Sequence, residues 1–199
     1  TYFTARNYFN NGGRSLLVCR VLSGSYSAAT ASVATRQTGS VSAFTLESLA
    51  VGSELNTFGY SNGTLVSGSK FNFHYEVTGT DTTTGTFNIL IRQGDDRSSN
   101  KIILEQWTQL SLDPNSNNYI SAVIGDTALT YDSTNKYVKT SGNYTNKSQY
   151  IRVKSVNTPT PDFFDINGVA KPVYTGSLPA LSSGSFGGGS NGTTKKDRK

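Results

Sequence analysis

Apolar and polar residues alternate over residues 71–77 and again over 86–91, which constrains the fold of this chain more than any other feature. Every second side chain of an extended strand points to the same face, so this alternation predicts half-buried β-strands. The apolar residues in phase are Phe71, Phe73, Tyr75, Val77, Phe87, Ile89 and Ile91. The turn-rich link 78–85 predicts an antiparallel hairpin, and residues 101–107 predict a third strand beside it. We therefore expect an antiparallel meander.

Two more segments predict strands. In residues 43–51, Phe44, Leu46 and Ser48 fall on one face, and residues 149–156 indicate a later short strand. The polar stretch 23–42 is expected to be a long connection that contains one strand.

Two helices are predicted as well. The first occupies the aromatic-rich residues 1–13 and stops at a pair of glycines, and the apolar run 15–22 after it predicts a buried strand. The second begins at Asp113, a good N-cap, with Pro114 at the first helical position. Its apolar face and its end are expected at Tyr119, Ile120, Val123, Ile124 and Gly125.

The composition indicates a folded, β-rich protein. Apolar residues make up 35% and charged residues 16% of the 199 residues, and Tyr 11 and Phe 10 supply large apolar surfaces. Gly 20, together with abundant Ser, Thr and Asn, favours strands joined by polar turns. No stretch approaches the ~20 apolar residues that span a bilayer, so we expect no membrane insertion.

The net charge of +5 does not predict nucleic-acid binding. Four of the cations lie together at the end of the sequence, at Lys195, Lys196, Arg198 and Lys199, and the rest of the chain is close to neutral. A nucleic-acid surface needs basic and aromatic residues interleaved on one face. We expect no direct nucleic-acid partner.

No catalytic, cofactor-binding or metal site is predicted. Cys19 is the only cysteine and lies in an apolar run, and His74 is the only histidine and lies on the polar face of a predicted strand. A zinc site needs three or four ligands, and a Ser–His–Asp triad needs a carboxylate brought to His74 from elsewhere. We interpret Cys19 as buried and His74 as solvated.

Two further motifs are weak. Gly187 and Gly192 have the spacing of a phosphate-binding loop, but Thr193 stands where the lysine is needed, which favours a flexible link. The acidic pairs, at residues 95–96 and at 162 with 165, lie in polar turns that do not favour a glycosidase site. We expect no enzyme activity and no cofactor.

Aromatic residues leave one alternative open. Trp107, Tyr131, Tyr137, Tyr144 and Tyr150 are candidates for a surface on which sugars stack. This alternative describes a β-rich, glycan-binding accessory module of a phage tail or a cell surface. Aromatic residues of β proteins more often belong to the core or to a subunit interface.

Five segments, in order along the chain, resemble contractile phage tail sheath proteins. They are residues 3–21, 44–56, 101–126, 141–153 and 185–192. The longest contains the acidic strand residue Glu105, the run Leu110, Ser111, Leu112, Asp113 and Pro114, and the closing pair Gly125 and Asp126. The fourth is similar in Ser148, Tyr150 and Ile151, and the last carries Asn191 where the family usually has Asp.

This resemblance implies the middle portion of a sheath subunit, without the tube-binding domain and the terminal arms. The implied fold is α+β and β-rich, with an antiparallel meander or barrel-like inserted domain attached to part of an α/β sheath domain. Residues 1–22 would belong to the α/β core of the sheath domain, 23–100 to a β-rich region with an outward-facing insertion, and 101–158 to a strand-helix-strand part of the sheath domain. Residues 159–199 would form an extended Pro/Gly-rich segment with a flexible end.

The function implied by the resemblance is structural. Copies polymerise as stacked rings or a helix around the tail tube of a bacteriophage virion, and contraction drives the tube through the bacterial envelope for genome ejection. The partners would be other copies and, through parts of the protein outside this sequence, the tube protein and the baseplate. The expected location is the virion, with assembly in the host cytoplasm. Because the sequence does not begin with Met, we expect a fragment or a processed chain.

Overall fold

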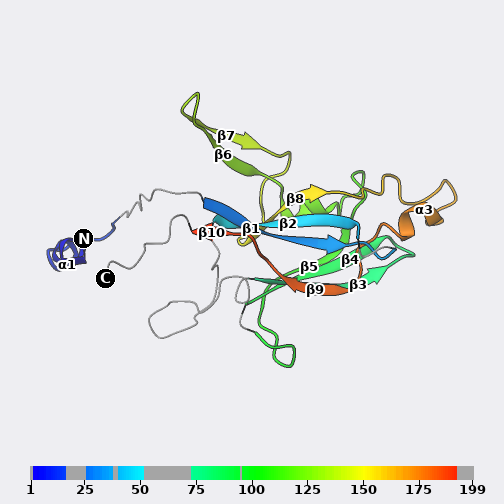
Figure 1. Ribbon diagram of the computed structural model, residues 1–199, viewed down its shortest axis with the longest axis horizontal. Coiled ribbons are helices and arrows are strands. Elements are labelled where there is room, and N and C mark those ends of the chain that lie inside the picture. Colours follow the sequence, from blue (N-terminus) through cyan, green and yellow to red (C-terminus); the bar gives the residue numbers. More distant parts are fainter. Residues whose placement is uncertain (1, 17–25, 38–39, 52–72, 95, 192–199) are drawn as a thin grey trace.

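Two four-stranded antiparallel sheets, packed face to face, form the body of the protein in the computed structural model (Figure 1). The structure describes residues 2–16, 26–37, 40–51, 73–94 and 96–191. The predicted β-rich, antiparallel fold is confirmed. No sheet among the described residues closes on itself, so the barrel-like form is not supported.

The first sheet has the strand order β10-β1-β2-β8. Its strands are β1 (Tyr26–Ala34), β2 (Ser42–Val51), β8 (Ile151–Val156) and β10 (Ser190–Asn191). Phe44, Leu46 and Ser48 of β2 are buried, as their alternation predicts. The strands predicted over 43–51 and 149–156 are therefore confirmed, and the polar stretch before β2 contains one strand, β1.

The second sheet has the order β5-β4-β3-β9. Its strands are β3 (His74–Asp81), β4 (Thr86–Arg92), β5 (Ile103–Ser111) and β9 (Ser182–Ser185). The register places Tyr75 opposite Ile91 and Val77 opposite Ile89, which confirms the predicted hairpin and meander. Phe71 lies outside the described residues.

The inward faces of the two sheets share one apolar core. The rings of Phe44 from the first sheet and Phe87 from the second stack with centroids 5.5 Å apart. Fully buried aliphatic side chains surround this pair, namely Leu46, Ile89, Ile91, Leu110, Leu112, Ile120, Ile124 and Ile151. Burial of this apolar surface is the main stabilising contribution to the fold.

Residues 182–191 cross from the second sheet to the first. After β9 pairs with β3, Gly187 forms a bridge with Thr30, and β10 then pairs with β1. Phe186, at the crossing, is fully buried. The sequence predicted a flexible glycine link over residues 187–194. This prediction is wrong for residues 187–191, which pair with β1. Backbone hydrogen bonds to a sheet edge do not depend on side chains, so composition alone does not reveal this pairing.

The chain enters and leaves the sandwich at one place. The backbone of Tyr26, at the start of β1, pairs with Asn191, and Ser27 pairs with Ser190. Paired residues of antiparallel strands lie about 5 Å apart, so the two ends of the sandwich meet. Such an arrangement allows a domain to be inserted into another chain segment.

In the part of the chain that the structure describes, three helices and one hairpin lie outside the two sheets. Helix α1 (Tyr2–Asn10) confirms the helix predicted over residues 1–13. Helix α3 (Pro172–Thr175) lies at the opposite end of the molecule from α1 (Figure 1). Strands β6 (Ala128–Asp132) and β7 (Tyr137–Ser141) form a hairpin that stands out from the sandwich, and the sequence did not predict it.

The start predicted for the second helix is wrong. Helix α2 spans only Ile120–Ile124, and Tyr119 occupies its N-cap position. Asp113, predicted as the cap ahead of Pro114, instead accepts a hydrogen bond from the backbone N–H of Asn115 through Oδ1, at 2.9 Å. This short-range bond favours a turn over a helix. The predicted apolar face is confirmed, because both terminal isoleucines of α2 are buried.

Some predictions stay untested. The buried strand predicted over 15–22 lies largely outside the described residues, which include only residues 15 and 16 of it. The assignment of residues 1–22 to an α/β core therefore remains a prediction. Within the described ranges, no helix has the length and apolar character needed to cross a membrane.

Candidate functional site

A network of five charged or titratable side chains lies on the outward face of the second sheet, where β3 begins and β4 ends. Arg92, the last residue of β4, donates from Nε and Nη2 to Asp96 Oδ2 and Oδ1 at 2.7 and 2.9 Å. Its Nη1 donates to Glu76 Oε2 at 2.9 Å, and Lys101 Nζ donates to Glu76 Oε1 at 2.7 Å. His74 Nδ1 lies 3.3 Å from Asp96 Oδ1. We call these five residues the Arg92 cluster.

The cluster is buried at its centre. The side chain of Asp96 has 0% of its surface exposed, and that of Arg92 has 6%. Burial raises the pKa of Asp96, but hydrogen bonds from Arg92, from the backbone N–H of Ile102 and from His74 outweigh it. The pKa of Asp96 therefore lies below its ordinary value of 3.8.

The other ionised groups of the cluster are stabilised in the same way. A hydrogen bond from Lys101 is the largest cause that lowers the pKa of Glu76 below its ordinary value of 4.5. The hydrogen bond to Asp96 raises the pKa of the Arg92 guanidinium. Each group thus keeps its charge because its partners compensate the loss of water.

The expectation that Asp96 lies in a solvated turn is wrong, because its carboxylate is the buried centre of the cluster. The interpretation of His74 as a solvated side chain is also wrong, because only 22% of its side-chain surface is exposed and its ring contacts Asp96. Asp95 lies outside the described residues. Opposite charges on the outward faces of adjacent strands, such as Glu76 and Arg92, were the signal that sequence reasoning missed.

His74, Asp96 and several serines raise the question of a Ser–His–Asp triad. Ser98, Ser183 and Ser185 line a pocket of about 240 Å³ together with His74 and Asp96. Among the described residues, no serine hydroxyl forms a hydrogen bond with His74, and both carboxylate oxygens of Asp96 bind Arg92. A triad requires a base that contacts its nucleophile, so this geometry favours a structural ion pair.

The lowered carboxylate pKa values predict a loss of stability in acid. A carboxylate with a depressed pKa binds fewer protons in the folded state than in the unfolded state. Its contribution is therefore fully present above the ordinary values, 4.5 for Glu76 and 3.8 for Asp96, and is lost as the pH falls below them. Urea unfolding between pH 7 and pH 3 should show this decline, and Glu76→Gln should make it shallower. An unchanged slope in the variant would contradict this assignment.

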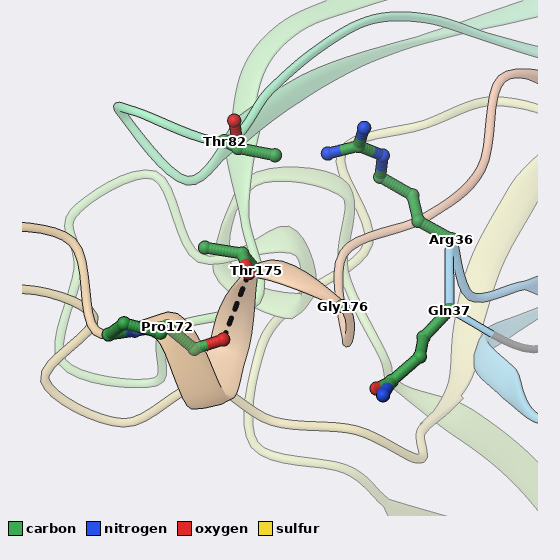
Figure 2. A pocket seen from close by; sticks show the side chains of 6 residues that line it. All are labelled: Arg36, Gln37, Thr82, Pro172, Thr175 and Gly176. Carbon is green, nitrogen blue, oxygen red and sulfur yellow. Dashed lines mark hydrogen bonds between the residues drawn. The ribbon is translucent and has the colours of Figure 1, made fainter.

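An open pocket of about 480 Å³ lies between the end of β1, the β3–β4 turn and α3 (Figure 2). Arg36, Gln37, Thr82, Pro172, Thr175 and Gly176 line it. The Arg36 side chain extends toward Thr82 (Figure 2). The hydroxyl group of Thr175 donates a hydrogen bond to Pro172 O at 2.9 Å (Figure 2). Arg36 is the charged residue of this lining, and its side chain is exposed.

Two residues that carry the sheath resemblance contact each other. Ser148 Oγ donates to Glu105 Oε2 at 2.6 Å, and the backbone N–H of Gln149 donates to Glu105 Oε1 at 2.8 Å. Glu105 belongs to β5 of the second sheet, and Ser148 precedes β8 of the first. The contact therefore ties the two sheets together, which gives both residues a structural role.

The five aromatic candidates for sugar stacking do not share one setting. Trp107 and Tyr150 pack against the core, and Tyr144 meets the ring of Tyr119 edge-on. Tyr131 and Tyr137 are exposed on the β6–β7 hairpin, but the strand register puts them on opposite faces of it.

The remaining acidic candidates accept hydrogen bonds, Asp165 from the backbone of its own turn and Asp162 from a side chain distant in sequence. Asp165 Oδ1 accepts hydrogen bonds from the backbone N–H groups of Asn167 and Val169, both at 2.8 Å. Asp162 Oδ1 accepts one from Asn115 Nδ2 at 3.0 Å. Across the described residues, no group of three or more His, Cys, Asp or Glu side chains is arranged to hold a metal ion. Cys19, Gly192, Thr193 and the basic residues 195–199 lie outside the described part.

Comparisons with known proteins gave no relative for this chain. No protein-family model matches the sequence. No curated protein matches it, and no solved structure matches it.

Proposed function

We propose that this chain is part of the structural subunit of a contractile phage tail sheath and that its sandwich is the outward-facing inserted domain. The insertion is then larger than the 23–100 region that the resemblance implies, because strands β5, β8, β9 and β10 of the sandwich lie after residue 100. The ordered resemblance of five sequence segments to that family suggests the assignment. The observation that carries it is the pairing of Tyr26 with Asn191, which brings both ends of the sandwich to one point. A domain joined in this way adds to a core without interrupting the fold of that core.

The exposed aromatic residues of α1 also support an assembly role. Phe3, Tyr8 and Phe9 are all exposed on this nine-residue helix. Large exposed apolar side chains gathered on one short element are typical of surfaces that bind another protein segment. In a sheath subunit, α1 would belong to the α/β core from which the sandwich projects.

The mechanism follows from assembly. Copies arranged around a tail tube would pass from an extended to a contracted packing, and the free-energy difference between the two packings would drive the tube forward. The sandwich moves as a rigid body in this account, because its core and the Arg92 cluster hold both sheets in one arrangement. The chain supplies no reaction centre, and the tube protein and the baseplate are its partners through other parts of the protein.

Electron microscopy of the full-length gene product that contains this chain tests the proposal. We expect hollow, striated tubes when the purified protein is concentrated, because heterologous contacts that do not close produce helical polymers. A protein that remains monomeric at every concentration would contradict the proposal. Glycan binding by that monomer would favour the accessory-module alternative.

A further inference from the structure

The pocket between the end of β1, the β3–β4 turn and α3 has the size of a small-molecule site. Its volume of about 480 Å³ falls within the range of roughly 300–1,000 Å³ that is typical of such sites. Arg36 and Gln37 come from one side of it, and Pro172 and Thr175 come from the opposite side (Figure 2). We call it the Arg36 pocket.

Backbone hydrogen bonds tie the two sides of the Arg36 pocket together. The backbone N–H of Arg36 donates to Leu178 O at 2.9 Å, and that of Gln37 donates to Gly176 O at 3.2 Å. These bonds fix the chain segments that carry the lining side chains. A pocket whose walls are already held in place loses little conformational freedom when a ligand enters, which favours binding.

Arg36 gives the pocket a positive charge that no ion pair compensates. Its side chain is exposed, and across the described residues no carboxylate forms an ion pair with it. Asp81 and Lys171 are next to lining residues in the sequence, but neither lines the pocket, and their charges are opposite. Both oxygens of Asp81 accept hydrogen bonds within its own turn. A single guanidinium matches a singly charged anion, and it binds a carboxylate through two parallel hydrogen bonds.

The rest of the lining suits a ligand that also carries hydroxyl groups. Thr175 uses its hydroxyl hydrogen in the bond to Pro172 O, so its oxygen is left as an acceptor. Gln37 contributes an amide, which both donates and accepts, and Thr82 contributes a second hydroxyl group. A simple carboxylate has no donor for the acceptors of this lining. The hydroxyl groups of a sugar both donate and accept.

The polar lining also favours a sugar over an acidic peptide. Protein-binding surfaces are enriched in aromatic residues, which act as anchors. Among the lining residues that the structure describes, only Pro172 has an apolar side chain.

We propose that the Arg36 pocket binds a sugar acid, a hydroxylated ring that carries one carboxylate. Arg36 binds the carboxylate, and the amide and hydroxyl side chains of the lining bind the ring hydroxyls. This site goes beyond the sheath function and does not depend on it.

Saturation-transfer NMR titration of the full-length protein with methyl α-D-galacturonide tests the site. We expect its Kd to be at least about tenfold lower than that of the neutral methyl α-D-galactoside, because hydrogen bonds to a charged group are the strong ones. Arg36→Gln should weaken galacturonide binding by a similar factor. Arg14→Gln is the matched control, because Arg14 is exposed and lies outside the lining, and it should leave the affinity unchanged.

Gly176→Ala tests the hydroxyl contacts separately from the charge. The φ of −76° at Gly176 suits alanine, but the new Cβ would lie 2.6 Å from Gln37 Oε1 and would displace that amide. We expect galacturonide and galactoside binding to weaken by the same factor, roughly three- to tenfold, as the loss of a neutral hydrogen bond implies. An unchanged affinity for both sugars would overturn the assignment of ring hydroxyls to this lining.

The remaining outcomes separate the sources of the ligand and the two proposals. Tighter binding of trigalacturonate than of the monosaccharide would identify a unit of an acidic polysaccharide, and equal binding would identify a free sugar acid. Galacturonide binding that survives Arg36→Gln, or equally tight binding of N-acetylglutamate amide, would overturn the site. Tubes that bind no sugar acid would overturn this inference and leave the sheath proposal standing. Sugar-acid binding by a protein that forms no tubes would do the reverse.

Discussion

Replacing Phe186 with Ala should destabilise the sandwich by about 3–5 kcal/mol, the cost typical of a buried Phe→Ala change. Phe186 is fully buried at the point where the chain crosses between the sheets, and its ring meets those of Phe73 and Tyr75 edge-on. Its backbone N–H also donates to Phe73 O at 2.9 Å. The change would leave a cavity that the paired strands around it cannot close. Urea unfolding followed by tryptophan fluorescence at Trp107 measures the loss.

The matched control is Phe9→Ala, because Phe9 is an exposed aromatic residue of α1. We expect this variant to unfold within about 0.5 kcal/mol of the parent, as surface substitutions usually do. A similar loss in both variants, or a loss below about 1 kcal/mol for Phe186→Ala, would show that the crossing does not hold the sandwich together.

Replacing Arg92 with Met should cost about 3–5 kcal/mol, the range measured when one partner of a buried ion pair is removed. The change leaves the carboxylate of Asp96, which has no exposed side-chain surface, without its two strongest hydrogen bonds. Glu76 would also lose the bond from Arg92 Nη1. Thermal unfolding at neutral pH measures the effect.

Two comparison variants separate the buried charge from lost packing. Lys101→Met removes the more exposed end of the Arg92 cluster and should cost less than about 1 kcal/mol. Arg92→Met combined with Asp96→Asn removes the uncompensated charge, so it should be more stable than Arg92→Met alone. Equal stability of the single and double variants would show that the carboxylate is not the cause of the loss.

Alternation of apolar and polar residues was sufficient to predict the strands with large side chains. Phe73, Tyr75, Phe87 and Ile89 lie in phase, and all four are buried in the structure. Strands β9 and β10 were not predicted, since they consist of Ser, Gly and Asn. Pairing with β3 and β1 makes them strands, and that information lies in the tertiary fold.

Local polar chemistry explains the other errors. Asp113 has the residue type of a helix cap, but its carboxylate holds a turn and also binds the backbone of Phe163, 50 residues away. Asp96 lies among Gly, Asp and Ser, a composition that predicts a solvated turn. Its burial depends on Arg92 and Ile102, which only the folded sheet brings together.

The most direct test of the sheath assignment is a three-dimensional reconstruction of the tubes formed by the full-length protein. The account predicts one sandwich per subunit at the outer radius, joined inward through the paired ends at Tyr26 and Asn191. Density for the sandwich against the inner tube, or a particle without helical order, would contradict it.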